Sequence, residues 1–327
     1  MLATTVRLHM NEAPYPPAPA VLEAAGEALT ELNRYADPAE MEGLRESLAD
    51  YCQLSKDHIA LSPGSDLLLR EVIHTFSKGR KVITVTPSFL PTVQAAKHFA
   101  PEYLSIRLSP PTFELNLEFL MSALEGPCLL IIDNPNNPTG NTLLGPAAVE
   151  ALLKHDDVLL VLDEAYYEFS GVTFAPMVAS SPRLMIVRTL DKAFSLAGAR
   201  VGYGIVGKGF GDLLSSFCTF LPRPSLYAAI AAIRQSDYMQ ENVSRVVKER
   251  MRLRQRLQGL GIRVYPSDTN FLLVRTEIPD SVLRLKDAGV LVHDASNQLP
   301  AGFVRVSVGT PEENNAFVEG LSQQMKV

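Results

Sequence analysis

The chain has 327 residues, of which 46% are hydrophobic and 20% are charged, and its formal net charge is −6. This length and balance predict a folded globular protein of about two domains and exclude a disordered chain. The acidic net charge and the scattered basic residues argue against nucleic acid or an anionic membrane as a partner.

Three cysteines, Cys52, Cys128 and Cys218, lie far apart and do not have the spacing of metal ligands, so we expect reduced thiols and no metal site. The N-terminus does not have a basic start followed by an apolar stretch, and no segment approaches the length of a membrane span. These features predict a cytoplasmic protein.

The first elements alternate between loops and helices. Residues 1–19 include Asn-Glu-Ala-Pro-Tyr-Pro-Pro, which is too rich in proline for a helix or strand and predicts an extended arm. Helices are expected at 19–32 and 39–53, and a short strand at 59–62 leads through Pro-Gly-Ser-Asp into a helix at 67–76. That helix N-terminus can accept a phosphate, although an ordinary cap by Ser65 or Asp66 is equally consistent with these residues.

Strands and helices then alternate as far as residue 206. Strands are expected at 81–86, 103–106, 129–132, 158–162, 184–187 and 202–206, with a helix at 89–99. Several of these strands are continuous runs of Val, Ile and Leu, which are typical of strands covered on both faces. We therefore predict an α/β fold with a mostly parallel central sheet flanked by helices.

The pattern changes after the Pro-Arg-Pro segment at 222–224. A long helical segment is expected at 225–259, followed by strands at 262–265, 271–275, 290–293 and 303–308 and by helices at 281–288 and from 311 onward. This order predicts a second, smaller α+β domain. We place the large domain at 26–235 and the small domain at 236–327, with an arm at 1–25 that contributes to the small domain.

Polar residues follow three successive predicted strands of the large domain. Asn137 and Asp163 follow the strands at 129–132 and 158–162, and Lys192 follows the strand at 184–187. Ligands of such sheets bind beyond the carboxyl ends of the strands. A buried carboxylate at Asp163 needs a cationic partner, and a protonated ring nitrogen is one possibility.

Lys192 stands among small and apolar neighbours, and Arg200 follows it in the same segment. Burial disfavours the ammonium form of a lysine and leaves its amine able to attack a carbonyl, while an arginine binds an anion through two hydrogen bonds. The pair predicts an aldehyde cofactor that carries a phosphate. A solvated loop lysine and a surface arginine are the alternative.

Four motifs occur in one order over nearly the whole chain. They are Asn-Pro-Asn-Asn-Pro-Thr-Gly at 134–140, Asp-Glu-Ala-Tyr at 163–166, Arg-Thr-Leu-Asp-Lys-Ala-Phe-Ser-Leu-Ala-Gly-Ala-Arg at 188–200 and Val-Arg-Val-Ser-Val-Gly-Thr at 304–310. In these motifs the chain resembles the pyridoxal-phosphate enzymes of the aspartate aminotransferase superfamily, fold type I, and most closely the histidinol-phosphate aminotransferase family. The resemblance implies a homodimeric aminotransferase of histidine biosynthesis that moves an amino group from an amino acid or histidinol phosphate to a 2-oxo acid such as 2-oxoglutarate.

The resemblance also implies a role for each matching residue. Lys192 would form the Schiff base with pyridoxal phosphate and move the proton, and Asp163 would pair with the ring nitrogen. Tyr166 and Asn137 would bind the ring oxygen. The phosphate would be held by Gly64, Ser65, Asp66, Thr189 and Arg200. The remaining contacts implied are a stacking Phe89, a Tyr35 that reaches the phosphate of the partner subunit, and Asn270 and Arg305 on the substrate carboxylate.

Some of these positions have simpler interpretations. Tyr35 and Phe89 are also consistent with packing aromatics, Asn270 with a turn residue and Arg305 with a surface arginine. Three positions depart from the family pattern, namely Asp191 in place of a serine, His293 in place of an arginine, and Arg223 in a segment that usually contains tyrosine and asparagine. Two other functions stay open, a decarboxylase of a phosphorylated amino acid, like threonine-phosphate decarboxylase, and a non-enzymatic sensor that binds the cofactor.

Overall fold

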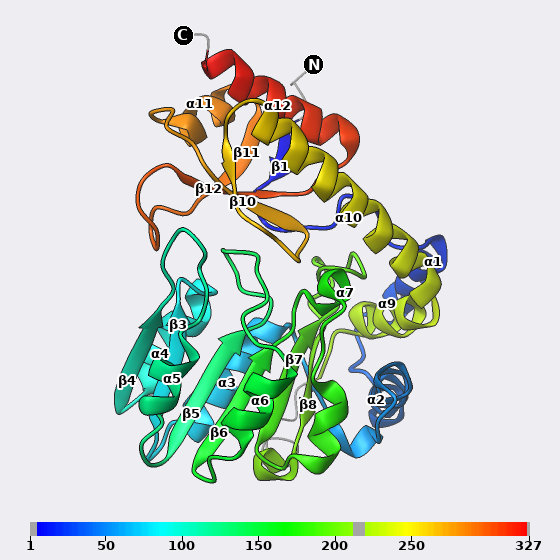
Figure 1. The fold of residues 1–327 in the computed structure, drawn as a ribbon. Coiled ribbons are helices and arrows are strands. Elements are labelled where there is room, and N and C mark those ends of the chain that lie inside the picture. Colours follow the sequence, from blue (N-terminus) through cyan, green and yellow to red (C-terminus); the bar gives the residue numbers. More distant parts are fainter. Residues whose placement is uncertain (1–4, 212–219, 326–327) are drawn as a thin grey trace.

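The computed structural model describes residues 5–211 and 220–325 of the chain, so the predicted thiol Cys218 lies outside the described residues. A sheet of seven strands and a sheet of five strands form the two halves of the molecule, and Figure 1 shows the smaller sheet above the larger one. The first and last described segments, β1 (Val6–Leu8) and α12 (Pro311–Gln324), both belong to the part of the molecule around the smaller sheet (Figure 1). Among the described residues, no helix has the length and apolar character needed to cross a bilayer.

The seven-stranded sheet has the order β2-β8-β7-β6-β5-β3-β4. Its strands are β2 (Ile59–Ser62), β3 (Lys81–Thr86), β4 (Glu102–Arg107), β5 (Cys128–Asp133), β6 (Val158–Asp163), β7 (Leu184–Thr189) and β8 (Gly202–Val206). Strands β3 to β7 pair in parallel, whereas β8 runs antiparallel to both β2 and β7. The predicted α/β fold with a mostly parallel sheet is therefore confirmed.

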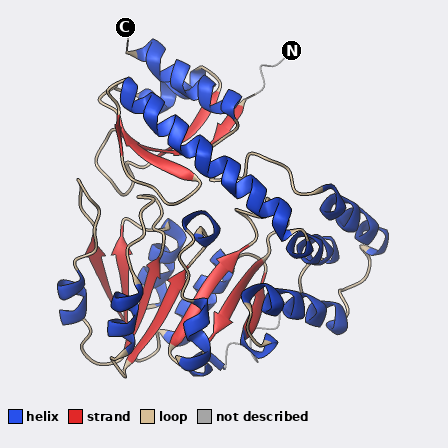
Figure 2. Ribbon diagram, turned by 45° about the vertical axis from the view of Figure 1, so that its right-hand side comes forward, coloured by secondary structure: helices blue, strands red, loops and turns tan. Residues whose placement is uncertain are grey.

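Helices cover both faces of this sheet, as Figure 2 shows. The helices α3 (Ser65–Phe76) and α4 (Leu90–Phe99) cover one face, and the helices α2 (Pro38–Cys52), α5 (Leu117–Ser122) and α6 (Pro146–Leu153) cover the other. Side chains alternate along a strand, so Val161 of β6 packs with α3 while its neighbour Leu162 packs on the opposite face. The same alternation controls where the polar residues at the strand ends point.

The five-stranded sheet has the order β1-β11-β12-β10-β9. Its strands are β1 (Val6–Leu8), β9 (Arg263–Val264), β10 (Phe271–Arg275), β11 (Val290–Asp294) and β12 (Phe303–Ser307). The helices α10 (Ser236–Gly259), α11 (Ser281–Asp287) and α12 (Pro311–Gln324) pack on its outer face (Figure 1). Its other face is turned toward the large sheet.

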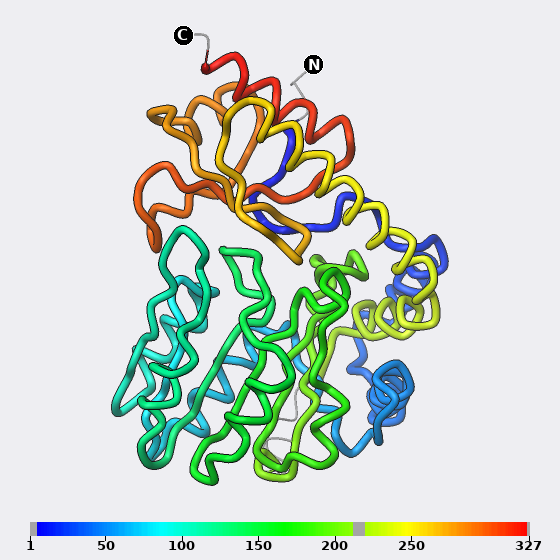
Figure 3. The backbone as a smooth tube through the Cα atoms, viewed as in Figure 1, coloured from blue at the N-terminus to red at the C-terminus, as the bar shows by residue number. Residues whose placement is uncertain are grey.

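Two local predictions are wrong. The arm was expected to contain no strand, but Val6–Leu8 forms β1 and pairs in parallel with β11, because these residues precede the prolines and the edge of β11 offers free backbone groups. The helix expected at 225–259 is two helices, α9 (Arg223–Arg234) and α10, with Gln235 between them at φ −103 and ψ 33. This break lets α9 pack on α1 (Pro19–Ala28) while α10 turns toward the small sheet (Figure 3).

Candidate active site

A cavity of about 600 Å³ lies beyond the carboxyl ends of β5, β6 and β7. Three parts of the chain line it: the ends of the large sheet, the inner side of the small sheet and the arm. Of the predicted site residues, those that line it are Ser65, Asp66, Phe89, Asn137, Asp163, Tyr166, Thr189, Lys192, Arg200 and Arg305. The fold thus gathers most of the predicted site around one space.

One end of the cavity has the features of an anion site. Helix α3 begins after Gly64, and no side chain caps it, so the alternative of a cap by Ser65 or Asp66 is wrong and the first amides of the helix stay free to bind an anion. Gly64 has a φ of +93, and a Cβ atom there would overlap the guanidinium of Arg200. The glycine is required because Arg200 lies directly against the turn.

Two carboxylates already flank Arg200 in this structure. Its guanidinium forms ion pairs with Asp66 and with Asp191. Asp191 therefore turns toward Arg200, and one of its oxygens is buried without a hydrogen-bond partner among the described residues. Burial raises the pKa of the Asp191 carboxyl although the charge of Arg200 opposes the rise. The departure at position 191 thus reduces the free positive charge at this end of the cavity.

Asp163 presents a buried carboxylate to the cavity. Its Oδ1 accepts the Ala165 amide at 3.0 Å, and no cation pairs with it among the described residues. Burial raises the pKa of this carboxyl from its ordinary 3.8 to about 7, and the charge of Asp133 adds to the rise. Asp133 itself accepts hydrogen bonds from Ser88 and from the Asn137 amide, so it holds the loop after β5. Asp163 is the acid that still needs a cation.

Lys192 faces the same space from the segment after β7. Its Nζ donates to the backbone carbonyl of Met10 at 3.3 Å. Burial lowers the pKa of this amine, Asp191 opposes the effect, and the charges of Arg305 and Arg200 reinforce it. The site therefore favours the neutral amine, which is the form that attacks a carbonyl or takes up a proton.

Arg305 lines the side opposite the anion end, from the middle of β12. Its side chain is buried at 8% exposure, and it donates to Asn137 Oδ1 and to the His9 carbonyl, both at 2.7 Å. No carboxylate pairs with it among the described residues, and burial lowers its pKa. A buried guanidinium with only neutral acceptors is a strong anion site, because a negative ligand would restore the lost charge balance.

His293 is the register neighbour of Arg305 across β11 and β12, and it also lines the cavity. Burial lowers its pKa from 6.5 to about 4, and the charge of Arg305 adds to the effect. The imidazole is therefore neutral near pH 7. It offers the ligand a hydrogen bond but not the charge of an arginine.

Four predicted or departing residues lie outside the cavity lining. Gly64 is behind Arg200, and Asn270 donates to the Asn11 carbonyl at 3.0 Å. Tyr35 is 85% exposed and lies 5.4 Å from the ring of Phe220, so this chain alone does not bring it to the site. Arg223 pairs with Glu31 and Glu40 at the start of α9 with its side chain only 14% exposed, so it neither replaces a charge in the pocket nor lies free at the surface.

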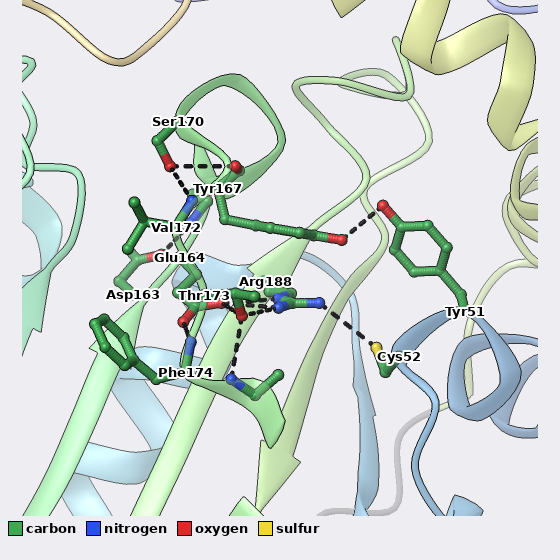
Figure 4. A network of polar contacts seen from close by, with 12 residues as sticks. Tyr51, Cys52, Asp163, Glu164, Tyr167, Ser170, Val172, Thr173, Phe174 and Arg188 are labelled. Carbon is green, nitrogen blue, oxygen red and sulfur yellow. Dashed lines mark hydrogen bonds and ion pairs between the residues drawn. The ribbon is translucent and has the colours of Figure 1, made fainter. Parts of the chain in front are cut away.

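A buried ion pair lies directly behind the strand ends (Figure 4). Arg188 donates through Nε and Nη2 to Glu164 Oε2 at 3.1 and 2.9 Å, and its guanidinium lies 3.6 Å from the centre of the Tyr167 ring. Glu164 also accepts the Phe174 amide at 2.6 Å. Both charged side chains are buried and point away from the cavity, on the face of the sheet opposite to Asp163 and Thr189. The pair joins β6 and β7 where they carry the site.

Two groups of residues at the site were not predicted from the sequence. The ion pair behind the strands had a signal, since an arginine inside the apolar strand Leu-Met-Ile-Val-Arg-Thr must find a buried partner. The other group comprises further cavity-lining residues, among them Met10, Asn11, Glu12, Asn297 and Gln298. Only Asn11 and Glu12 had a signal, as polar residues that open the proline-rich segment.

These observations fit pyridoxal phosphate. Asp163 is a buried acid without a cation, and a protonated ring nitrogen supplies one. The uncapped start of α3 with Arg200 suits the phosphate, and Lys192 offers the aldehyde an amine whose pKa burial has lowered. Phe89, Asn137, Tyr166 and Thr189 line the space between these groups.

Comparisons with known proteins agree with this chemistry. The family model described as aminotransferase class I and II matches residues 3–321. The chain is 35% identical to a histidinol-phosphate aminotransferase of Sulfurisphaera tokodaii, over 97% of this chain and 90% of that protein, and 33% identical to one of Pseudomonas syringae, over 98% and 93%. The crystal structure of histidinol-phosphate aminotransferase from Sinorhizobium meliloti in complex with pyridoxal-5'-phosphate superposes with a TM-score of 0.85 at 25% identity, covering 99% of this chain and 91% of that one.

Proposed function

The chain belongs to the class I and II aminotransferases, which depend on pyridoxal phosphate, and we propose that its amino donor is histidinol phosphate. The amino group would be transferred to a 2-oxo acid such as 2-oxoglutarate. The observation that carries the proposal is Arg305, a buried guanidinium that lacks a carboxylate partner among the described residues and lines the same cavity as Lys192. An amino donor therefore has to present an anion to this residue, and a phosphate or a carboxylate satisfies it.

Most residues of the site are proposed to bind the cofactor or the substrate, and one is proposed to transfer a proton. When bound, the cofactor supplies a ring that withdraws electrons from the substrate carbon. Asp163 would pair with the ring nitrogen, and Tyr166 and Asn137 would donate to the ring oxygen. The phosphate would be held by the first amides of α3 together with Gly64, Ser65, Asp66, Thr189 and Arg200. Phe89 would pack against the ring and Arg305 would bind the substrate anion, whereas Asn270, which lies outside the cavity lining, would act only by holding Asn11.

Lys192 would carry the proton in each half-reaction. Burial lowers its pKa and so favours the neutral amine, which would accept a proton from the substrate carbon and pass it to the cofactor.

The chain would work as a homodimer in the cytoplasm. The support for shared sites is Tyr35, whose exposed ring cannot serve its own cavity but would be free to reach the phosphate in a partner subunit. We further propose an arm at 1–25, a large cofactor-binding domain at 26–235 and a small domain at 236–327. The two separate sheets support this division, and the pairing of β1 with β11 places the arm beside the small domain.

A screen of single half-reactions tests the substrate. The purified protein loaded with pyridoxal phosphate is mixed with histidinol phosphate, histidine, aromatic amino acids or phosphothreonine, and its absorbance is followed. We expect conversion of the cofactor to its amine form, fastest with histidinol phosphate and reversed by 2-oxoglutarate. Faster conversion with another amino acid would contradict the proposed donor. Release of carbon dioxide without the amine form would favour a decarboxylase, and no reaction with any donor would favour a sensor.

A further inference from the structure

Three consecutive residues of the arm, His9–Asn11, contact the site although none was assigned a role there. The carbonyl of His9 accepts a hydrogen bond from Arg305 at 2.7 Å, and the carbonyl of Met10 accepts one from Lys192 at 3.3 Å. Asn11 is the third residue, and unlike the first two it contacts the site through its side chain. The arm is therefore part of the wall of the cavity.

Asn11 is held in one orientation by four hydrogen bonds. Its backbone has a φ of 53, a left-handed conformation that asparagine tolerates well, and the residue is 1% exposed. Its N–H donates to Ser307 Oγ at 2.8 Å, and its carbonyl accepts from Asn270 at 3.0 Å. Because Ser307 Oγ accepts that N–H, its own proton is free to reach Asn11 Oδ1 at 3.2 Å. This bond fixes the amide oxygen on Ser307 and turns the amide nitrogen the other way.

The amide nitrogen of Asn11 points at the phenol oxygen of Tyr166, at 3.0 Å. A second amide nitrogen, that of Asn137, lies 3.5 Å from the same oxygen. Both groups can only donate, so the phenol oxygen accepts and its own proton has to point elsewhere. Tyr166 lines the cavity, and a phenol that accepts hydrogen bonds becomes a stronger donor itself.

We propose that Asn11 is a positioning residue that aims the Tyr166 proton into the cavity and strengthens it as a donor to the ring oxygen of the cofactor. The inference rests on the proposed assignment of Tyr166 to that oxygen. It gives the arm a part in the reaction, since Asn11 joins Tyr166, which follows β6, to Ser307 of β12 and to Asn270, which precedes β10. The site is then complete only when the arm is in place.

The first test is Asn11→Gly in the protein loaded with pyridoxal phosphate. Glycine keeps the left-handed backbone and both backbone hydrogen bonds but removes the donor to Tyr166. A weaker phenol donor stabilises negative charge on the ring oxygen less. We therefore expect the pH midpoint of the absorbance change of the bound cofactor to move upward by about half to one pH unit.

Matched variants separate this role from a purely structural one. Asn11→Asp has the same shape but replaces the donor by an acceptor, which draws the phenol proton away from the cavity, so we expect an upward movement at least as large. Tyr166→Phe should move the midpoint further, and adding Asn11→Gly to it should change nothing more. Ser307→Ala removes a partner of Asn11 but leaves the contact to Tyr166, so its effect should be smaller than that of Asn11→Gly.

Two results would overturn the inference while leaving the role of Tyr166 intact. One is an unchanged midpoint in Asn11→Gly and Asn11→Asp where Tyr166→Phe moves it. The other is an equal movement for Asn11→Gly with and without the Tyr166 hydroxyl, because the effect would then not pass through the phenol. A midpoint that Tyr166→Phe does not move would instead overturn the assignment of Tyr166, and the inference with it.

Discussion

The two walls of the cavity are held by different forces. The sheet wall, formed by Asp163, Thr189 and Lys192, stands on parallel strands in fixed register and is joined behind by the ion pair of Arg188 and Glu164. The opposite wall, which we call the arm wall, consists of residues 10–12 with His293 of β11 and Arg305 of β12. Hydrogen bonds between segments far apart in the chain attach the arm to β12. The sheet wall is thus fixed by strand pairing, as are His293 and Arg305, whereas the arm itself is placed by polar contacts that a ligand can exchange.

The charges of the two walls differ in the same way. On the sheet wall, burial shifts the pKa of Asp163 and that of Lys192 so that the neutral form of each is favoured. A bound cofactor with complementary charges would stabilise the charged form of Asp163. On the arm wall, Arg305 is charged and donates hydrogen bonds only to neutral acceptors, so it is available to bind the anion of a substrate. The sheet wall therefore suits a permanently bound cofactor, and the arm wall suits a substrate that binds and dissociates in each cycle.

The largest effect is expected from the sheet wall, with Lys192→Ala. The variant loses the amine that carries the proton, so turnover should fall by about 10⁴-fold or more. Turnover measured with a saturating donor checks the prediction, and Lys154→Ala, at the exposed end of α6, is the matched control that should keep full activity. Full turnover in Lys192→Ala would contradict the proposal that the Lys192 amine transfers the proton.

The next effect concerns the support behind the sheet wall. Arg188→Met leaves Glu164 charged and buried, which should lower the free energy of unfolding by about 3–5 kcal/mol. The double variant Glu164→Leu with Arg188→Met should recover much of this loss, because no buried charge is left unpaired. Denaturant unfolding measures both.

Arg45→Met is the control for the loss of an arginine, because it breaks only a half-exposed pair with Glu42 at 3.2 Å and should change stability by about 1 kcal/mol or less. If Arg45→Met and Arg188→Met lowered the free energy of unfolding equally, the buried pair would contribute no more to stability than the half-exposed one.

Asp163 links function and stability in the sheet wall. Its pKa in the folded protein is raised from 3.8 to about 7, so it weakens the fold progressively as the pH rises toward 7 and most above it. Asp163→Asn should therefore stabilise the cofactor-free protein at pH 8 by up to about 4 kcal/mol, and by about 2–3 kcal/mol less at pH 5. Unfolding at both pH values checks this, and activity should fall because the ring nitrogen loses its partner. A gain that is the same at both pH values would contradict the raised pKa.

The smallest effect is expected from His293 in the arm wall. Because its pKa is lowered to about 4, the imidazole stays neutral above pH 5. As the pH falls from 6.5 toward 4, the unfolded chain takes up the proton before the folded protein does, so the free energy of unfolding decreases over that range. The pH profile of kcat/KM for the donor should show no ionisation of His293 between pH 6 and 8, and His293→Gln should leave that profile unchanged. A profile limb near pH 6.5 that disappears in His293→Gln would show that the arm wall carries a second charge.

Much of the sheet wall was predictable. The strands at 59–62, 81–86 and 202–206 have the predicted bounds, and the polar residues that follow β5, β6 and β7 meet at one edge as expected. The reason is local: apolar runs mark buried parallel strands, and the ends of such strands converge. Helices α5, α6 and α7 (Tyr167–Ser170) were not predicted, because they are short and their periodicity is weak.

The sequence by itself determined the alternating fold, the set of reactive groups and their arrangement at the strand ends, because these depend on the period of side chains and on motifs within short segments. The tertiary structure alone decided the break at Gln235, the pairing of Arg188 with Glu164, the neutral state of His293 and the place of Asn11. Each of these depends on burial or on contacts between residues distant in the chain, and neither leaves a local pattern in the sequence.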